Sequence, residues 1–359
     1  MTETRKIIIT GTHITPAIEL IHQLQSDRDI NWEIFYIGRR FNSSVQREAS
    51  IESKIIPQNN VKFYGILCGK YDRRWLPNTI SGLPQMLSGF KSAHQILKKV
   101  KPHLIVSFGG YVSVPVIISA WLQNLPSITH EQTHTLSLST KINALFCRHI
   151  ALSFPVTKSS DKYLVTGNLL RREIFNFHSQ YFEKQKFDLK KFPLIYLTAG
   201  NQGSHRLNLV LKKLLPSLCK RFTIIHQSGS KDFNRYKKLS LKFPNYLVKN
   251  YIDSVDIGWI FHHSKLIVSR AGANTTQEIA VLGLNSVIIP LLISQQNEQF
   301  KNALWLQEKL PKNTIIIKES ELTAKSLEKS INILASKKKA PSSVLPSPNL
   351  KLLKLIKKL

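Results

Sequence analysis

Short apolar segments alternate with amphipathic ones along most of the chain. KIIIT at 6–10 is typical of a buried strand, and AIELIHQL at 17–24 has apolar residues at helical spacing. The loop GTHITP separates them, so this stretch predicts a strand, a tight loop and a helix. Further strands are predicted in the first half at 32–38, 104–108, 127–129 and 149–154. Such alternation predicts right-handed βαβ units and a parallel sheet.

A second series of the same kind begins at LIYLTAG, residues 194–200, and continues with a helical stretch at 207–218. Further strands are predicted at 222–227, 246–252, 265–270 and 286–291. Because a strand, a glycine-containing loop and a helix open both series, we expect two Rossmann-like halves joined near 167–175. Ligands of such sheets bind at the carboxyl ends of the strands, which predicts an active site in a cleft between the halves.

Length and composition favour a globular protein of two domains. The chain has 359 residues, whereas one hydrophobic core rarely serves more than about 250–300. Its 42% hydrophobic and 20% charged residues exclude collagen-like and low-complexity classes. Three scattered cysteines without C-x-x-C spacing favour a reducing compartment and provide no zinc ligand set. We expect domains at 1–168 and 169–339.

Two segments raise the question of a membrane. Residues 104–122 carry no charge and are long enough to span a bilayer, but Gly109, Gly110 and Pro115 interrupt them. We therefore interpret this run as a strand, a turn and a helix. The tail at about 340–359 predicts a basic amphipathic helix, which lies on a membrane surface or packs on the protein; the two are compatible, because a packed helix still exposes its lysines.

The strongest local signal is SRAGANTTQEIAVLG at 269–283, where a strand is followed by small residues and a helix that begins near Asn274 or Thr275. The unpaired N–H groups and the dipole of a helix start favour phosphate binding. Glu278, about one turn further, is placed to accept hydrogen bonds from ribose hydroxyls. In the alternative interpretation, Asn274 or Thr275 only caps the helix and Glu278 only complements its dipole.

Other candidate residues follow the predicted strands of the first half. His13 stands in the loop after the first strand, where a histidine can act as a general base near neutral pH, although an isolated histidine is more often a surface or capping residue. Gly109 and Gly110 either expose N–H groups to an anion or simply make a turn. The THEQT segment provides His130 and Glu131, which are either functional or a structural pair.

Two patterns argue against cofactor and metal sites. The first loop lacks the G-x-G-x-x-G pattern of nicotinamide-nucleotide sites. The Asp-Arg-Asp run at 27–29 resembles a metal-binding Asp-x-Asp, but it follows a helix in a charged turn, so we interpret it as solvated surface.

Taken in order, the motifs resemble those of the undecaprenyldiphospho-muramoylpentapeptide β-N-acetylglucosaminyltransferase family over nearly the whole chain. The resemblance rests on TGTHITPA, SFGGYVSVP, LPSITHEQ, GNLLR, TAGNQGSHRLN, YIDSV, SRAGANTTQEIAVLG and EQFKNA. It implies an α/β GT-B fold, in which two Rossmann-like domains with parallel sheets face each other across a cleft. It also implies inverting transfer of N-acetylglucosamine from its UDP ester to the C4 hydroxyl of a muramoyl-peptide linked to undecaprenyl diphosphate.

The resemblance also implies roles for individual residues. His13 is the candidate base, and Glu131 is a second catalytic candidate that would share this role. The implied donor contacts are Thr10, Gly11, Thr12, Arg171, Asn201, Gln202, Ile252, Ala273, Asn274, Thr275, Thr276, Gln277, Glu278, Glu298 and Gln299. The implied acceptor contacts are Gly109, Gly110, Tyr111, His130 and Gln132. No metal or other cofactor is expected, and the start of the helix near 273–275 would stabilise the departing UDP.

The charge indicates where such an enzyme works. With 51 Lys and Arg against 22 Asp and Glu, the formal net charge is +29. Anionic headgroups attract basic surfaces, so we expect a peripheral protein on the cytoplasmic face of the cell membrane, with UDP-N-acetylglucosamine and the lipid-linked muramoyl-peptide as substrates. No nucleic-acid-binding motif is present in the sequence, so we do not expect nucleic acid as a partner. The alternatives are a UDP-N-acetylglucosamine epimerase, another GT-B enzyme, or a non-catalytic membrane-associated binding module.

Overall fold

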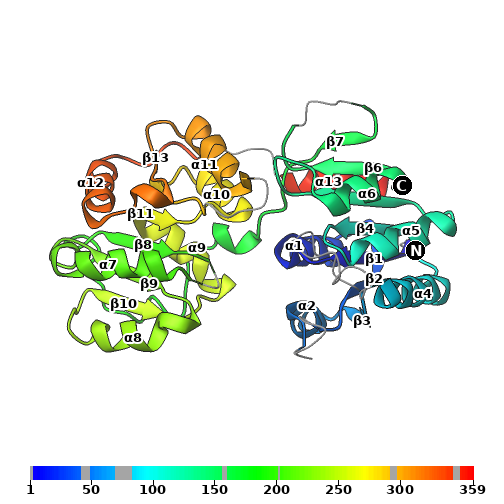
Figure 1. The fold of residues 1–359 in the computed structure, drawn as a ribbon, viewed down its shortest axis with the longest axis horizontal. Helices are drawn as coiled ribbons and strands as arrows, with labels where there is room; N and C mark the ends of the chain where they lie inside the picture. The colour runs from blue at the N-terminus through cyan, green and yellow to red at the C-terminus, as the bar shows by residue number, and fades with distance from the viewer. Residues whose placement is uncertain are drawn as a thin grey trace. The chain divides into compact units, whose positions relative to one another are not determined.

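Two parallel sheets organise the chain, one in each of its two units (Figure 1). The computed structural model describes residues 3–41, 49–68, 83–155, 160–200, 203–291, 297–342 and 348–359. The first unit comprises Met1–Arg171 and Pro346–Leu359, and the second comprises Arg172–Leu345. This division lies next to the expected boundary at 168/169, and the end of the chain belongs to the first unit.

The described part of the first unit has a seven-stranded sheet in the order β3-β2-β1-β4-β5-β6-β7, with every pair parallel. Its strands are β1 (Glu3–Gly11), β2 (Ile30–Arg39), β3 (Lys62–Ile66), β4 (Leu104–Phe108), β5 (Ser127–Glu131), β6 (His149–Leu152) and β7 (Tyr163–Val165). The helices are α1 (Ile14–Gln25), α2 (Ile51–Ile55), η1 (Ile56–Asn59), α4 (Leu83–Val100), α5 (Ser113–Leu122), α6 (Leu138–Phe146) and α13 (Pro348–Lys357).

Helices cover both faces of this sheet, which is why its strands are apolar on both sides. Successive side chains of a strand point to opposite faces. Ile7 and Ile9 of β1 accordingly pack in one core with α1 and α13, whereas Ile8 packs in another with α4 and α5. At their carboxyl ends, β1, β4 and β5 lead into the loops that carry the predicted site residues of this unit.

The described part of the second unit has a six-stranded parallel sheet in the order β10-β9-β8-β11-β12-β13. Its strands are β8 (Leu194–Thr198), β9 (Thr223–Gln227), β10 (Tyr246–Lys249), β11 (Ser264–Ser269), β12 (Ser286–Ile288) and β13 (Thr314–Ile316). The helices are η2 (Arg172–Phe175), α7 (His205–Leu218), α8 (Ser230–Ser240), α9 (Ser254–His263), α10 (Ala273–Val281), α11 (Glu298–Lys309), η4 (Glu319–Glu321) and α12 (Ala324–Ala335).

The α/β class and the two parallel sheets predicted from the sequence are confirmed. The uncharged run at 104–122 forms β4, a turn and α5, as expected. In the part of the chain that the structure describes, no helix is both long enough and apolar enough to cross a membrane. The short strands β3, β7 and β13, each at the edge of its sheet, were not predicted from the sequence.

The C-terminal helix α13 packs on the first unit. Leu352 and Ile356 are fully buried in the core that also contains α1, and Lys351 and Lys354 are exposed. Of the two interpretations of the tail, packing on the protein therefore applies.

The Asp-Arg-Asp turn holds this helix, so its interpretation as solvated surface is wrong for Asp27. The ammonium of Lys357 lies 2.6 Å from the Asp27 carboxylate and 2.7 Å from that of Asp29. The Asp27 side chain is only 2% exposed, and it also accepts a hydrogen bond from Trp32 Nε1 at 2.9 Å. A contact between residues so distant in sequence leaves no trace in a local pattern.

Candidate functional site

In the second unit, β11 leads into α10 through Arg270, Ala271 and Gly272. The helix begins at Ala273, and Gly272 is its N-cap residue with no side-chain hydrogen bond to the helix start. The alternative in which Asn274 or Thr275 caps the helix is therefore wrong. The segment 272–275 is partly exposed, so the positive end of the helix dipole is open to a ligand.

Three side chains predicted to contact the donor lie deeper than expected. Thr276, Gln277 and Glu278 are 0%, 7% and 0% exposed. The Thr276 hydroxyl donates to the carbonyl of Gly272, and Gln277 Nε2 has no hydrogen-bond partner among the described residues. The contact of Glu278 with a ribose stays a prediction, and it requires the buried carboxylate to become accessible.

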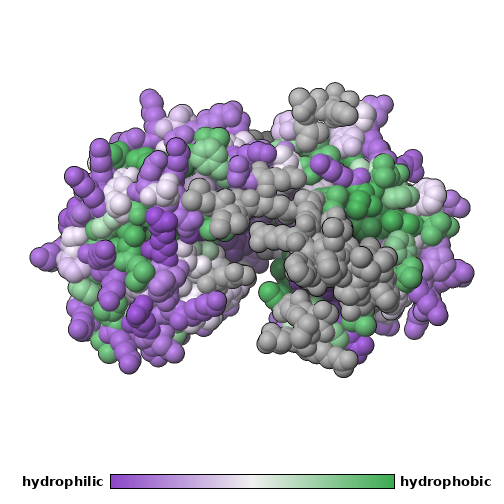
Figure 2. All heavy atoms as spheres, in the orientation of Figure 1, coloured by the Kyte–Doolittle hydropathy of each residue, from purple (hydrophilic) through white to green (hydrophobic). Residues whose placement is uncertain are grey.

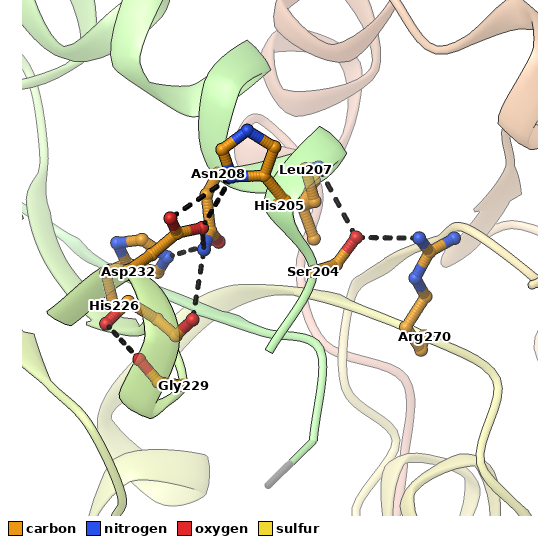
Figure 3. A network of polar contacts seen from close by, with 9 residues as sticks. Ser204, His205, Leu207, Asn208, His226, Gly229, Asp232 and Arg270 are labelled. Carbon is orange, nitrogen blue, oxygen red and sulfur yellow. Dashed lines mark hydrogen bonds and ion pairs between the residues drawn. The ribbon is translucent and has the colours of Figure 1, made fainter. Parts of the chain in front are cut away.

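Two buried side chains hold the loop that precedes α10. The guanidinium of Arg270 donates to Ser204 Oγ at 2.7 Å, and Figure 3 shows these two side chains pointing towards each other. Asn302 of α11, which is fully buried, donates to the carbonyl oxygen of Ala271 at 3.0 Å. The start of α10 is thus fixed by neighbouring elements and not by a cap of its own.

The remaining predicted donor contacts of this unit lie in three places. Glu298 and Gln299 open α11, which packs against α10, and Gln299 Oε1 accepts a hydrogen bond from Leu291 N at 3.0 Å. Ile252 follows β10 and is 6% exposed, so it offers little surface to a base in this structure. Asn201 and Gln202 lie outside the described residues.

The loop after β8 is supported by polar side chains beneath it. Gln227 of β9 donates to the carbonyl of Gly200 at 3.2 Å. Gly203 has φ +71°, and a Cβ there would lie 2.1 Å from the carbonyl oxygen of Ser228, so only glycine fits. Asn208 of α7 fixes that same carbonyl at 3.0 Å and also binds Asp232 and the buried His226, the network drawn in Figure 3.

In the first unit, the loop after β1 packs against the loop after β4. The N–H of Thr12 donates to the carbonyl of Gly109 at 3.2 Å, and a Cβ on Gly110 would lie 2.2 Å from Thr12 Oγ1. Thr10 is fully buried, and Gly11 has φ +134° against the backbone of Phe108. The structure thus groups the first loop, predicted to contact the donor, with residues predicted to contact the acceptor.

Gly109 and Gly110 make a turn, and the anion interpretation of their N–H groups is not supported. Both residues have positive φ, at +70° and +79°. The N–H of Gly109 donates to Ser107 Oγ and that of Gly110 to Ser139 Oγ, both at 3.1 Å. Because both donors are already used, an anion would have to displace a serine.

Glu131 organises the loop that follows β5. Its carboxylate accepts hydrogen bonds from the N–H groups of Gln132, Thr133 and Ser137 at 2.8–3.1 Å, and from the Thr133 hydroxyl. Burial alone would raise the pKa of Glu131, but the hydrogen bonds from Ser137, Thr140 and Thr133 outweigh it and hold the pKa below its ordinary value. A carboxylate so occupied is a weak base, which favours His13.

His130 is buried, and this disagrees with a direct contact to the acceptor. The residue is 1% exposed, and its Nε2 lies 2.9 Å from the carbonyl of Gly167. Burial lowers the pKa of His130 to about 4, so the ring is neutral. Its Nδ1 has no partner among the described residues, and Glu131 is not its hydrogen-bond partner there, so the two are not a structural pair. Gln132 is likewise buried, at 5% exposed.

His13, which follows the carboxyl end of β1, is exposed. It is the N-cap residue of α1, but its side chain makes no hydrogen bond to the helix start, and its Cδ2 approaches Gly109. Although the ring is exposed, the protein surrounding it lowers its pKa by reducing hydration, with Arg39 acting in the same direction and Glu131 opposing. A neutral imidazole with a free nitrogen can accept a proton.

Tyr111 belongs to a polar cluster beside this loop. Its hydroxyl is hydrogen-bonded to Arg39, and Arg39 is paired with the buried Glu52 at 2.7 Å. Burial raises the pKa of Tyr111, so it remains a neutral donor. Arg171, predicted to contact the donor, is partly buried and is the last residue of the main segment of this unit.

Several residues that shape these loops were missed from the sequence. The supporting side chains are Ser107, Ser139, Ser204, Asn208, Gln227, Asn302 and Glu319. Ser107, Ser204, Asn208 and Asn302 lie within quoted motifs, a signal that could have identified them. For the part of the chain that the structure covers, no group of three His, Cys, Asp or Glu residues could hold a metal ion.

Both halves of the chain match models of one protein family. Residues 7–152 match the N-terminal domain of glycosyltransferase family 28, and residues 194–358 match its C-terminal domain.

Relatives of similar length carry one common name. The chain is 30% identical over 340 residues to UDP-N-acetylglucosamine--N-acetylmuramyl-(pentapeptide) pyrophosphoryl-undecaprenol N-acetylglucosamine transferase of Clostridium tetani, covering 92% of this chain and 90% of that protein. It is 33% identical over 341 residues to the protein of the same name from Borreliella burgdorferi, covering 89% and 87%.

Solved structures share the fold. The crystal structure of MurG from Acinetobacter baumannii aligns with a TM-score of 0.72 at 22% identity, covering 99% of this chain and all of that one. UDP-GlcNAc 2-epimerase from Neisseria meningitidis, bound to UDP-GlcNAc, aligns with a TM-score of 0.61 at 14% identity, covering 98% and 99%. At these identities the likeness concerns the fold alone.

Proposed function

Because the chain belongs to glycosyltransferase family 28, we propose that it transfers N-acetylglucosamine from UDP-N-acetylglucosamine to the C4 hydroxyl of a muramoyl-peptide linked to undecaprenyl diphosphate. The reaction converts lipid I to lipid II in peptidoglycan synthesis. The observation that carries this conclusion is the identity to transferases of that name over nearly the whole chain.

The second unit supplies the donor site in this proposal. The uncapped, partly exposed start of α10 directs N–H groups and the positive end of a helix dipole at the diphosphate. Glu278 would bind the ribose, and Glu298 and Gln299 at the start of α11 would bind the sugar hydroxyls. The same helix start stabilises the negative charge that develops on the leaving UDP.

The first unit supplies the base. Neutral His13 takes the proton of the acceptor C4 hydroxyl as the oxygen attacks the anomeric carbon. The new bond forms on the face opposite the bond to phosphate, which breaks with its electron pair going to UDP. One displacement of this kind inverts the anomeric centre, and His13 then releases the proton to solvent.

We expect this reaction to need no divalent metal. The charge on UDP would be met by the α10 helix start, so the protein itself supplies the electrostatic stabilisation. Activity retained in excess EDTA supports this expectation, and activity restored only by Mg²⁺ or Mn²⁺ contradicts it.

A lipid-linked acceptor also requires docking at a membrane. Trp121, Leu122 and Leu145 of α5 and α6 are 52%, 58% and 74% exposed, and Figure 2 shows hydrophobic side chains gathered over these helices. Exposed Lys141 and Arg148 lie in or next to α6. An apolar patch with basic neighbours fits the anionic cytoplasmic face of the cell membrane, with peripheral attachment.

The decisive assay combines the purified protein with UDP-N-acetylglucosamine and the lipid-linked muramoyl-peptide. The proposal expects release of UDP and appearance of the disaccharide lipid, both dependent on the acceptor. Turnover of the donor alone would instead indicate an epimerase. Donor binding without any UDP release would indicate a non-catalytic binding module.

A further inference from the structure

Segments that follow the carboxyl ends of strands in the second sheet meet at the guanidinium of Arg270. Its Nη2 donates to Ser204 Oγ at 2.7 Å and to Glu319 Oε1 at 2.5 Å, and its Nη1 donates to the carbonyl of Ile289 at 3.2 Å. Ser204 follows β8, Ile289 follows β12 and Glu319 follows β13. Arg270 itself follows β11. Its side chain therefore connects the segments that follow β8, β11, β12 and β13, four strands that are neighbours in the sheet.

The charge of Arg270 is satisfied within the protein. Its side chain is 10% exposed and that of Glu319 is 13% exposed, so the pair is largely removed from water. A planar guanidinium holds several acceptors in fixed directions, and a buried charge with its partner is costly to disrupt. Arg270 is therefore suited to fix the position of its neighbours, and its charge is not free to attract a phosphate.

The neighbours that it fixes are two helix starts. Ser204 is the N-cap of α7, where its Oγ also accepts from Leu207 N. Arg270 lies two positions before Gly272, the N-cap of α10. The hydroxyl of Ser204 is consequently shared between the start of one helix and the segment that leads to the other.

We propose that Ser204, Arg270 and Glu319 form a positioning clamp that holds the start of α10 relative to the start of α7 and thereby sets the affinity for the diphosphate of a nucleotide. The inference rests on the proposed function, because it assumes that the diphosphate binds at the start of α10. Anion binding by helix N–H groups depends on their placement, and small displacements weaken it. These three residues act through others and do not themselves contact the substrate.

The test compares Ser204→Ala with Ser204→Thr. Alanine removes the hydroxyl that accepts from Arg270, and threonine keeps it. Loss of one hydrogen bond to a charged group is expected to weaken UDP binding about tenfold, measured by calorimetry. KM for UDP-N-acetylglucosamine should rise by a similar factor, and kcat should fall as well because the same helix start stabilises the leaving UDP, with the KM for the acceptor near that of the wild type. Ser204→Thr, which keeps the hydroxyl, should bind UDP about as tightly as the wild type does.

A second pair of variants tests the carboxylate. Glu319→Gln removes the charge that faces Arg270, whereas Glu328→Gln removes the partner of Arg221 on α12 of the same unit, at 3.4 Å. We expect weaker UDP binding only in Glu319→Gln. Combined with Ser204→Ala, its effect should be non-additive, because both residues act through Arg270.

The outcomes separate the clamp from the proposed function. If Ser204→Ala is less stable to heat but binds UDP as the wild type does, the hydroxyl is only structural and the clamp is wrong. If the threonine variant fails to restore affinity while it remains folded, the clamp is also wrong. If the wild type itself does not bind UDP, the proposed function fails and the inference falls with it.

Discussion

The side-chain amide of Asn302 donates a hydrogen bond to the main-chain carbonyl of Ala271, with 3.0 Å between the two atoms. Both residues are fully buried. Through this bond, α11 holds the residue that comes two positions before the first turn of α10. The candidate donor site therefore depends on a contact that touches no ligand.

Replacing Asn302 should affect both stability and affinity. Asn302→Ala leaves the buried carbonyl of Ala271 without this donor, which is expected to cost about 1–3 kcal/mol in the free energy of unfolding. Denaturant titration measures that loss, and UDP binding should weaken as well. Asn245→Ala is the matched control, because its amide binds the carbonyl of Cys219 beside the amino end of β10. Equal UDP affinity in Asn302→Ala and the control would contradict this role.

The predicted contact between Glu278 and the ribose can be tested by removing one ribose hydroxyl from the nucleotide. If its carboxylate accepts hydrogen bonds from the ribose, the wild type should bind UDP about tenfold or more tightly than 2′-deoxy-UDP. Glu278→Gln should lose most of that preference and weaken UDP binding. Because Glu278 is fully buried, thermal unfolding must accompany the calorimetry to confirm that the variant is folded. An unchanged preference in a folded variant would place the ribose elsewhere.

The pH dependence of catalysis should report His13. The base must be neutral, so kcat/KM should rise with pH through the pKa of His13. Reduced hydration holds that pKa below its ordinary value, so the rise should be complete before neutral pH. His13→Ala should lower kcat by about 10²–10⁴-fold.

His22 of the same helix provides a control for His13. Its ring binds Asn59, and His22→Gln should leave the rate and the pH profile unchanged. A profile that keeps its acidic limb in His13→Ala would exclude His13 as the base. Glu131→Gln is expected mainly to destabilise the loop that its carboxylate organises.

The ion pairs of α13 predict a pH-dependent stability. Burial alone would raise the pKa of Asp27, but the hydrogen bonds from Lys357 and Trp32 outweigh it and lower the pKa. The stabilisation is therefore present above the unfolded value of about 3.9 and lost as pH falls through the folded value. Lys357→Met should cost about 1 kcal/mol at pH 7 and almost nothing near pH 3.

The exposed Lys354 of the same helix is the matched control for this prediction. Lys354→Met should leave the unfolding free energy unchanged at both pH values. A difference between wild type and Lys357→Met that persists at low pH would show that the lysine stabilises α13 by packing alone.

Features that depend on residues close together in the sequence were predicted correctly, whereas features that depend on contacts between distant residues were not. Runs of apolar residues report burial on both faces of a sheet, which is why β4 is found at the residues predicted. The start of α10 was predicted within one or two residues, because small residues after a strand are a local signal. β13, with three residues at a sheet edge, has too short a pattern to be recognised.

The parts that could not be predicted depend on contacts between distant residues. Nothing local to Asp27 indicates Lys357, and nothing local to Arg270 indicates that Ser204 and Glu319 meet it. Burial of His130 and Glu278 has the same origin, because it depends on which elements pack over them. Motifs therefore located the loops of the site, and packing decided which of their side chains are accessible.

The most direct test of the account is a crystal structure of the protein with bound UDP. Phosphate oxygens are expected about 2.7–3.2 Å from the main-chain N–H groups of Ala273, Asn274 and Thr275. Diphosphate bound away from the start of α10, or no bound nucleotide at concentrations that saturate catalysis, would contradict it.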